Sequence, residues 1–297
     1  MILVTGATGF IGKHLINALK TKEGLENVIA FVSKPIENGN YLLHNNYNIS
    51  PGLFEKPVYK NIKTVIHAGA FTPKNGAQAN DISQSFSNIQ ITINLINALP
   101  NSVKHFIFFS TLDIYGESDT PLSEQSNIEP SSLYGQSKLY CEKMVLAWGK
   151  EKQIKVSILR IGHTYGPGEE AYKKIIPICI TRLQQNMAPQ IWGSGNDLRS
   201  FIYVEDVINM VINTISLNGN EGPVNIVSEK SVSINELVKM LIEISGLTIQ
   251  PEYISLNAKA KNLKFNASKM NKLLGTELTG LKEGLTVEWN YMLQLNK

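Results

Sequence analysis

The stretch "MILVTGATGFIGKHLINALK", Met1–Lys20, carries the strongest fold signal in the chain. It opens with the apolar run ILV, of the kind that a strand buried on both faces needs. Three glycines follow, and then a segment with the apolar period of a helix. Gly6 suits a tight turn, Gly9 lets a pyrophosphate approach the main chain, and Gly12 lets the helix lie close to the strand. The stretch predicts a strand, a turn and a helix whose N-terminus binds a dinucleotide.

Composition limits the classes of protein to consider. The chain has 297 residues, of which 43% are hydrophobic, which is ample for a buried core in one or two domains. The formal net charge of +3 comes without a stretch dense in Lys and Arg, so we expect no nucleic-acid partner. No apolar run approaches membrane-spanning length, and no membrane partner is expected. Cys141 and Cys179 suit reduced thiols in a cytoplasmic protein, and the five histidines lack the spacing of metal ligands.

Segments with strand and helix patterns alternate over about half of the chain. We expect strands at 27–32, 64–70, 105–110 and 156–162, and helices at 88–99 and 133–150. This alternation predicts an α/β protein whose parallel sheet is covered on both faces and binds ligands at the carboxyl ends of its strands. The connection from Ser33 to Thr64 has little helical periodicity, so we expect a short irregular crossover there. After Gly166 we expect helices at 172–186 and 233–245 and a strand at 190–192, while 201–215 pack back on the sheet.

Tyr134 and Lys138 form the candidate catalytic pair. They are four residues apart within "SSLYGQSK", so on a helix they share one face. A nearby cation lowers the pKa of a tyrosine and makes it a usable proton donor and acceptor. Thr111, at the end of a predicted strand, is placed to hydrogen-bond the same substrate oxygen. On its own the pair is also compatible with a solvated helix face, and the glycine turn together with Thr111 favours catalysis.

With these motifs in place, the sequence resembles the extended short-chain dehydrogenase/reductases, also called NAD-dependent epimerase/dehydratase proteins, which act mostly on nucleotide sugars. "TGATGFIG", "VIHAGA", "STLDIYG" with "YGQSK", "LRIGHTYGPG" and "WGSGNDLRSFIYVEDV" are similar to the family's motifs, and the resemblance covers the whole chain. It implies a Rossmann-type doubly wound parallel sheet with a smaller C-terminal substrate-binding α/β domain. We expect the dinucleotide-binding domain at 1–165, with 200–216 packing back onto it, and the nucleotide-sugar-binding domain at 166–297.

The resemblance also implies roles for individual residues. Thr111, Tyr134 and Lys138 would be catalytic, with Tyr134 as the acid/base and Lys138 on the nicotinamide ribose. Tyr115 has no lysine four residues later and is assigned to packing against substrate. The expected cofactor-binding residues are Gly6, Gly9, Phe10, Ile11, Gly12, Ser33, Lys34, Ala68, Gly69, Ala70, Tyr134 and Lys138. The expected substrate-binding residues are Thr72, Thr111, His163, Trp192, Arg199 and, more weakly, Asn225. Structural alternatives stay open for three of them: a core position for Trp192, a surface ion pair for Arg199 and a structural role for His163, where the family often has asparagine. The family commonly forms homodimers through the helices near 85–99 and 133–148.

Ser33 and Lys34 bear on the choice of cofactor. An Asp or Glu at the end of the second strand would accept hydrogen bonds from the NAD ribose and repel the 2'-phosphate of NADP. Here the place holds Ser33 and Lys34, which can donate to that phosphate, whereas Glu37 lies beyond Pro35. We therefore expect NADP, with NAD as the alternative if Lys34 is an uninvolved loop charge.

Three functions follow from this resemblance. We expect a reductase that transfers hydride from NAD(P)H to the C4 ketone of a nucleotide 4-keto-6-deoxy sugar, with Tyr134 as proton donor. The alternatives are an NAD-dependent nucleotide-sugar 4-epimerase and a non-catalytic nucleotide-binding sensor or scaffold. Dehydratases of the family carry an Asp-Glu pair after the catalytic Thr, and here the pair is replaced by Leu112 and Asp113, which argues against 4,6-dehydration.

Overall fold

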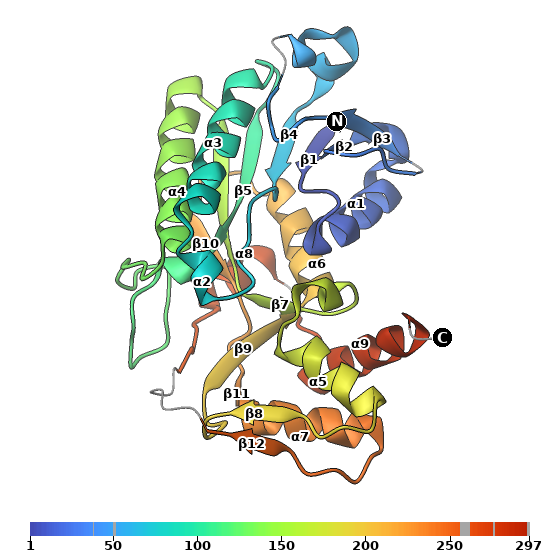
Figure 1. Ribbon diagram of the computed structural model, residues 1–297. Coiled ribbons are helices and arrows are strands. Elements are labelled where there is room, and N and C mark those ends of the chain that lie inside the picture. Colours follow the sequence, from blue (N-terminus) through green and yellow to red (C-terminus); the bar gives the residue numbers. More distant parts are fainter. Residues whose placement is uncertain (38, 50–51, 256–261, 276, 296–297) are drawn as a thin grey trace. The chain divides into compact units, whose positions relative to one another are not determined.

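The computed structural model describes residues 1–37, 39–49, 52–255, 262–275 and 277–295 (Figure 1). These residues form two compact units. The first unit comprises 1–116, 127–161 and 208–225, and the second comprises 117–126, 162–207 and 226–297. The chain thus crosses between the units several times, and neither unit is one continuous segment.

A seven-stranded sheet forms the core of the first unit. Its strand order is β10-β6-β5-β4-β1-β2-β3, and the neighbouring strands from β6 to β3 pair in parallel. The strands are β1 (Ile2–Thr5), β2 (Val28–Val32), β3 (Asn40–Leu43), β4 (Thr64–His67), β5 (His105–Thr111), β6 (Lys155–Ile161) and β10 (Pro223–Ile226). The chain runs outward from β1 in both directions, which confirms the predicted Rossmann-type doubly wound sheet.

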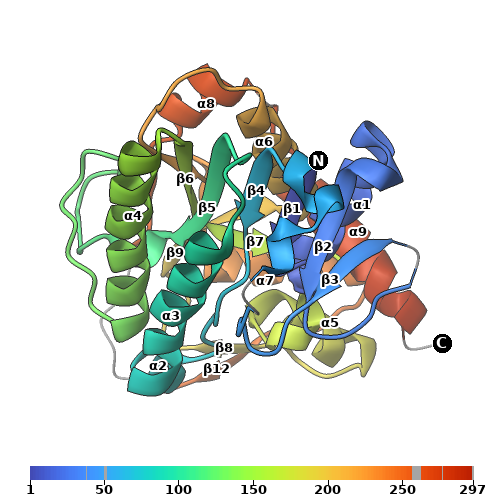
Figure 2. The same ribbon diagram turned by 90° about the horizontal axis from the view of Figure 1, so that it is seen from above.

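Helices cover both faces of this sheet. α3 (Ile82–Ala98) and α4 (Leu133–Lys152) lie side by side on one face, and α1 (Phe10–Glu23) lies on the other (Figure 2). The short helix α2 (Gly76–Ala79) and the 3-10 turns Leu25–Asn27, Leu53–Glu55, Pro57–Asn61 and Leu112–Ile114 complete the connections. α6 (Val204–Ile215) contributes its residues from Ile208 onward to this unit.

Two boundaries differ from the sequence prediction. The connection after β2 was expected to be irregular, but it contains the parallel edge strand β3, with Val32 paired to Leu43. Only Leu42 of β3 is buried, so the strand has no alternating apolar pattern to reveal it. α3 begins at Ile82 and not at Asn88, because Asp81 caps it by accepting a hydrogen bond from the Gln84 N–H at 2.9 Å.

The second unit contains two small sheets. β7 (His163–Tyr165), β9 (Leu198–Tyr203) and β11 (Ser231–Ser233) form one in the order β11-β9-β7, and β8 (Gln190–Trp192) pairs with β12 (Glu252–Ile254) in the other. The helices α5 (Ile175–Gln184), α7 (Ile234–Ser245) and α9 (Leu281–Leu295) pack against one another. α8 (Ser268–Leu274) and the 3-10 turn Glu169–Tyr172 complete the unit. That this unit binds the substrate stays a prediction.

Within the described residues we find no helix whose length and hydropathy would let it span a bilayer.

Candidate active site

The glycine turn between β1 and α1 leaves no room for side chains. Gly6 has φ +67°, in the left-handed region that favours glycine. A Cβ atom at Gly12 would lie 2.0 Å from the Gly6 carbonyl oxygen, so only glycine lets the helix start this close to the strand. The Gly9 N–H closes the turn by donating to the same oxygen at 2.9 Å.

The N-terminus of α1 fits a dinucleotide pyrophosphate. Its N-cap is Gly9, whose lack of a side chain leaves the end of the helix open to a ligand. Its first turn, which begins with Phe10 and Ile11, has no acidic residue. The first N–H groups of a helix lack partners within the helix, and the helix dipole attracts negative charge there. The local structure therefore suits the phosphate-binding role predicted for these residues.

A buried polar chain supports the other side of this turn. The Thr5 hydroxyl lies 2.7 Å from His67 Nδ1 and accepts a hydrogen bond from the Gly69 N–H at 2.9 Å. His67 Nε2 lies 3.2 Å from the hydroxyl of Thr92 on α3. Burial and the nearby Lys138 ammonium lower the pKa of His67 to about 3, so its ring is neutral at physiological pH. This chain fixes the loop Ala68–Ala70, which was predicted to contact the cofactor.

Tyr47 also enters the glycine turn, which no pattern in the sequence predicted. Its hydroxyl hydrogen-bonds the Thr5 side chain and the Gly6 backbone. A Cβ at Gly69 would lie 1.7 Å from this hydroxyl oxygen, so Gly69 is needed to admit the tyrosine. Tyr47 itself has φ +56°, an unusual value for a residue with a side chain.

Three of the predicted catalytic and substrate residues come together in the first unit. Tyr134 lies in the first turn of α4 and is 7% exposed, and the side chains of Thr111 and Thr72 hydrogen-bond to its phenol. Burial raises the pKa of Tyr134 above its ordinary value, and the negative charge of Asp113 raises it further. The phenol is therefore protonated at neutral pH, in the state that donates a proton.

Lys138 lies one helical turn beyond Tyr134 and is buried. Its ammonium is 4.2 Å from the centroid of the Phe108 ring. Burial lowers the pKa of Lys138 to about 8, while Cys141 and Glu142 act in the opposite direction. We predicted that Lys138 lowers the pKa of Tyr134. The net shift of the Tyr134 pKa is upward instead, because burial and Asp113 dominate and Lys138 is not among the groups that act on the phenol.

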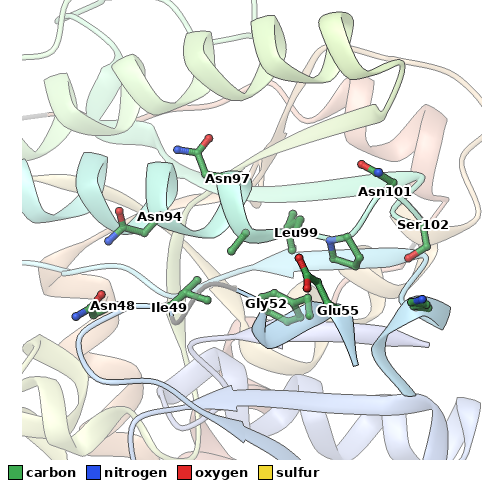
Figure 3. Close-up of a pocket in the computed structure, with 13 residues that line it drawn as sticks. Asn48, Ile49, Gly52, Glu55, Asn94, Asn97, Leu99, Asn101 and Ser102 are labelled. Carbon is green, nitrogen blue, oxygen red and sulfur yellow. The ribbon is translucent and has the colours of Figure 1, made fainter. Parts of the chain in front are cut away.

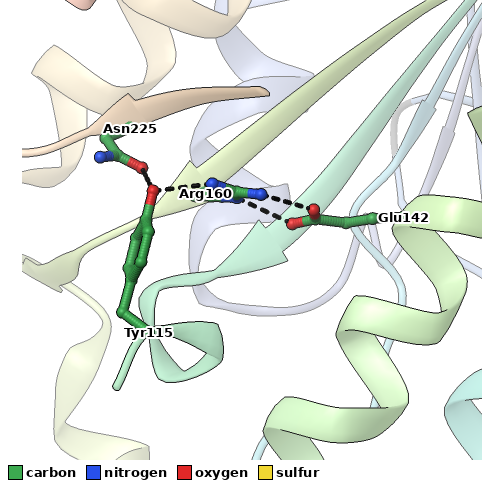
Figure 4. Close-up of polar contacts among 4 residues, drawn as sticks. All are labelled: Tyr115, Glu142, Arg160 and Asn225. Carbon is green, nitrogen blue, oxygen red and sulfur yellow. Dashed lines mark hydrogen bonds and ion pairs between the residues drawn. The ribbon is translucent and has the colours of Figure 1, made fainter. Parts of the chain in front are cut away.

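A buried network lies beyond Lys138 on α4 (Figure 4). Arg160 on β6 donates to both carboxylate oxygens of Glu142, at 3.0 and 2.9 Å, and to the hydroxyl of Tyr115 at 2.7 Å. Tyr115 in turn donates to Asn225 Oδ1 at 2.7 Å. The Tyr115 hydroxyl and Asn225 Oδ1 thus serve an internal network, and Asn225 is 0% exposed. The assignments of Tyr115 to substrate packing and of Asn225 to the base site stay predictions.

The second unit brings together two of its three predicted ligand-binding residues. His163 and Arg199 lie on the paired strands β7 and β9. Burial, aided by the positive charges of Lys174 and Arg199, lowers the pKa of His163 to about 4. Trp192 ends β8 in the other small sheet and is 58% exposed, so it is not a core residue.

Comparison with known proteins identifies the family. The model of the NAD dependent epimerase/dehydratase family matches residues 2–226, more than two thirds of the chain. The chain belongs to this family. The resemblance seen in the sequence is therefore confirmed.

Individual relatives differ in the activity for which they are named. The chain is 29% identical to a putative UDP-glucose 4-epimerase of Methanocaldococcus jannaschii over the full length of both. It is 30% identical to a dTDP-4-dehydro-6-deoxyglucose reductase of Escherichia coli, covering 81% of this chain and 80% of that one. Among solved structures it is similar to a UDP-glucuronic acid 4-epimerase from Bacillus cereus in complex with UDP-glucuronic acid and NAD, with a TM-score of 0.86, 26% identity and 99% coverage of both chains.

Within this family member, Ser33 and Lys34 follow β2 directly and are exposed. The carboxylate that follows in the sequence, Glu37, is also exposed. The structure thus leaves both Ser33 and Lys34 accessible at the carboxyl edge of the sheet, and their contact with a cofactor stays a prediction.

A separate cavity of about 1010 Å³ lies in the first unit, between α3 and the segment that precedes β4 (Figure 3). Asn94 and Asn97 face it from α3, and Asn48 and Ile49 line its other side. None of the residues predicted to bind cofactor or substrate lines this cavity.

Proposed function

We propose that the protein reduces the C4 ketone of a nucleotide 4-keto-6-deoxy sugar. The observation that carries the proposal is the state of Tyr134, which is buried, protonated at neutral pH and hydrogen-bonded to Thr111 and Thr72. A reductase needs a proton donor at the developing alkoxide, and this phenol starts in the donor state. The Escherichia coli relative is named as a reductase of such a sugar, which supports the same reading.

The cofactor would be held by the first unit. Gly6, Gly9 and Gly12 with the start of α1 would hold the pyrophosphate, and Lys138 would donate to the nicotinamide ribose. The bound dinucleotide supplies the hydride that adds to C4. Thr111 accepts a hydrogen bond from the Asp113 N–H at 3.2 Å, so its own hydroxyl hydrogen is directed to Tyr134 or to the sugar oxygen.

The nucleotide end of the substrate would be bound by the second unit. Arg199 is assigned to the diphosphate, for which a forked and permanently charged guanidinium is suited. His163 lies on the neighbouring strand β7, where it pairs with Phe201, two residues beyond Arg199. Its ring is neutral and hydrogen-bonds the Ser200 backbone, so we assign it to positioning beside Arg199. The exposed indole of Trp192 is available for stacking on the base.

We further propose NADP as the preferred cofactor. Ser33 and Lys34 follow β2 where an acidic residue would select NAD, and both are exposed. A reductase consumes its cofactor in every turnover, which accords with an exchangeable NADPH. The structural relative from Bacillus cereus is described with NAD, so NAD is the alternative.

A 4-epimerase is the second candidate. The full-length match to a putative UDP-glucose 4-epimerase and the similarity to UDP-glucuronic acid 4-epimerase favour it. A non-catalytic nucleotide-binding role is the third, and the assembled Thr111, Tyr134 and Lys138 argue against it.

One incubation separates these functions. Purified protein is mixed with NADPH and a panel of nucleotide 4-keto-6-deoxy sugars, and the absorbance of the reduced cofactor is followed. Loss of absorbance with one sugar supports the reductase. Interconversion of nucleotide sugars without net loss of NADPH would replace it with the epimerase, and no turnover of either kind would leave the non-catalytic role.

We also propose a two-fold symmetric homodimer that buries the outer surface of α3 and α4. Ile82 and Phe86 on α3 are 77% and 59% exposed, and Tyr140 and Leu146 on α4 are exposed as well. Exposed apolar side chains on two neighbouring helices are typical of an interface between copies of a chain.

A further inference from the structure

His44 occupies a position beside the predicted ribose-binding segment. β3 runs parallel to β2, so both strands end at the same edge of the sheet. The ladder continues past the last strand pair, because the His44 N–H donates to the Val32 carbonyl at 2.9 Å. His44 is therefore the neighbour of Ser33 across the two strands, and their side chains leave the same face of the sheet.

The turn after His44 connects this edge to the glycine turn. Residues 45–48 reverse the chain, with the Asn48 N–H donating to the Asn45 carbonyl at 2.7 Å. The turn directs Tyr47 inward, where its hydroxyl bonds Thr5 and Gly6. His44, three positions before Tyr47, therefore lies next to the segment that is proposed to hold the dinucleotide.

Packing fixes the orientation of the His44 ring. Its centroid is 4.5 Å from that of Phe31 and 4.1 Å from that of Tyr47. Its Nδ1 accepts a hydrogen bond from the Tyr47 N–H at 3.2 Å. Since burial lowers the pKa of His44, the ring is neutral at physiological pH, and its single hydrogen must then be on Nε2. No described residue hydrogen-bonds this Nε2, and the side chain is partly exposed.

We propose that His44 is a specificity-determining residue for NADP, donating from Nε2 to the 2'-phosphate beside Ser33 and Lys34; this rests on the proposed dinucleotide site. The three side chains supply a ring N–H, a hydroxyl and an ammonium, which together suit a phosphate dianion. A ribose 2'-hydroxyl would instead need an acceptor, and Glu37 is the one carboxylate in the sequence from 33 to 49.

Two substitutions distinguish the roles of the two ring nitrogens of His44. His44→Asn keeps an acceptor near the place of Nδ1, for the Tyr47 N–H, and removes the outward donor. His44→Gln reaches to the place of Nε2 with an amide N–H and gives up the inner acceptor. A merely structural role for His44 would be retained better by the first variant, and a role on the phosphate by the second.

The experiment measures dissociation constants of NADP⁺ and NAD⁺ for the full-length protein and both variants by calorimetry. We expect the unaltered protein to prefer NADP⁺. His44→Asn should weaken NADP⁺ binding by about tenfold, the scale of one hydrogen bond to a charged oxygen, and leave NAD⁺ unchanged. His44→Gln should retain most of the preference.

A preference of the unaltered protein for NAD⁺ would overturn the inference. So would a His44→Asn variant that loses affinity equally for both cofactors, or one whose affinities do not change. A greater loss of the NADP⁺ preference in His44→Gln than in His44→Asn would overturn it as well. Binding of neither cofactor by the unaltered protein would instead refute the proposed dinucleotide site itself, and the role of His44 with it.

Discussion

The guanidinium of Arg160 and the carboxylate of Glu142 form a doubly hydrogen-bonded ion pair whose side chains are 5% and 3% exposed. Glu142 lies one helical turn beyond Lys138 on α4, and its charge raises the pKa of that lysine against the effect of burial. The ion pair therefore joins the helix that carries Tyr134 and Lys138 to β6.

Removing one partner of this pair should be costly. Arg160→Ala leaves the Glu142 carboxylate buried without its counterion, and we expect a loss of about 3–5 kcal/mol in the free energy of unfolding. Urea denaturation measures it. Lys282→Ala is the control, since it breaks the exposed pair with Glu243 and should leave the unfolding midpoint nearly unchanged. Equal, small effects of both substitutions would contradict the buried pair.

Replacing Tyr134 with Phe tests the assignment of the proton donor. The ring and its packing remain, but the hydroxyl bonded to Thr111 and Thr72 is lost. Turnover with the accepted nucleotide sugar should fall by roughly two to four orders of magnitude, the scale of general acid assistance, while substrate binding survives. Tyr140→Phe, at an exposed position of the same helix, should keep normal turnover. Near-normal turnover in the Tyr134 variant would refute the assignment.

Cofactor affinity should depend on the charge of Lys138. Its pKa of about 8 means that the ammonium is present below this pH and is lost above it. The dissociation constant should therefore rise as the pH increases through about 8, because the neutral amine has lost its charge and one donor. Fluorescence titration measures the dissociation constant from pH 6.5 to 9.5, roughly the range over which such a lysine loses its proton. Lys138→Met should bind weakly with a flat profile, and a flat profile in the unaltered protein would argue against a role for the ammonium.

Glu288 should make stability depend on pH in the opposite sense to most carboxylates. It lies in α9 at 1% exposure, and burial together with the negative charges of Glu169 and Glu170 raises its pKa to about 9. The folded protein keeps the proton that the unfolded chain releases above its ordinary value of 4.5. This group's stabilising contribution is thus complete below about pH 4.5 and is lost progressively as the pH rises towards 9.

Glu288→Gln removes this loss of stability with rising pH, because the amide has no proton to lose. We expect a gain of about 1–3 kcal/mol at pH 7 and a larger gain at pH 9 than at pH 5, measured by thermal denaturation at the three values. Glu283→Gln on the exposed side of the same helix is the control. A stability loss that is the same at every pH would show that the carboxylate is needed for packing or for hydrogen bonds.

The proposed dimer makes a prediction about α3. Phe86→Asp places a charge in the apolar surface shared with α4, so sedimentation should show a shift from dimer to monomer. Leu25→Asp, at an exposed apolar position outside both helices, should leave the dimer intact. An unaltered protein that sediments as a monomer would refute the proposal.

The sequence predicted those parts of the fold whose geometry is set by residues close together in the chain. The glycines at positions 6, 9 and 12 and the pair Tyr134–Lys138 each lie within one strand-turn-helix or one helical turn, so their geometry follows from the backbone. Arg160 and Glu142 come from different elements, and nothing in either segment marks the partner. Tyr47 gave no signal because its place in the turn depends on a reversal at 45–48 that no apolar pattern announces.

The direction of the shift in the Tyr134 pKa could not be predicted from the sequence for a related reason. Spacing establishes that Lys138 is on the same helix face, but it does not establish how deeply the phenol is buried or that Asp113 is near. A charge four residues away and the removal of water act in opposite directions on a tyrosine, and only the folded environment decides between them.

The contact between Tyr47 and Gly69 links two positions that must change together over evolutionary time. With the tyrosine hydroxyl 1.7 Å from where a Cβ at Gly69 would lie, alanine at position 69 and tyrosine at position 47 exclude each other in this backbone. A lineage can therefore acquire alanine at 69 only after 47 has become smaller or has turned outward, and an aligned set of close relatives should show these two positions as a covarying pair.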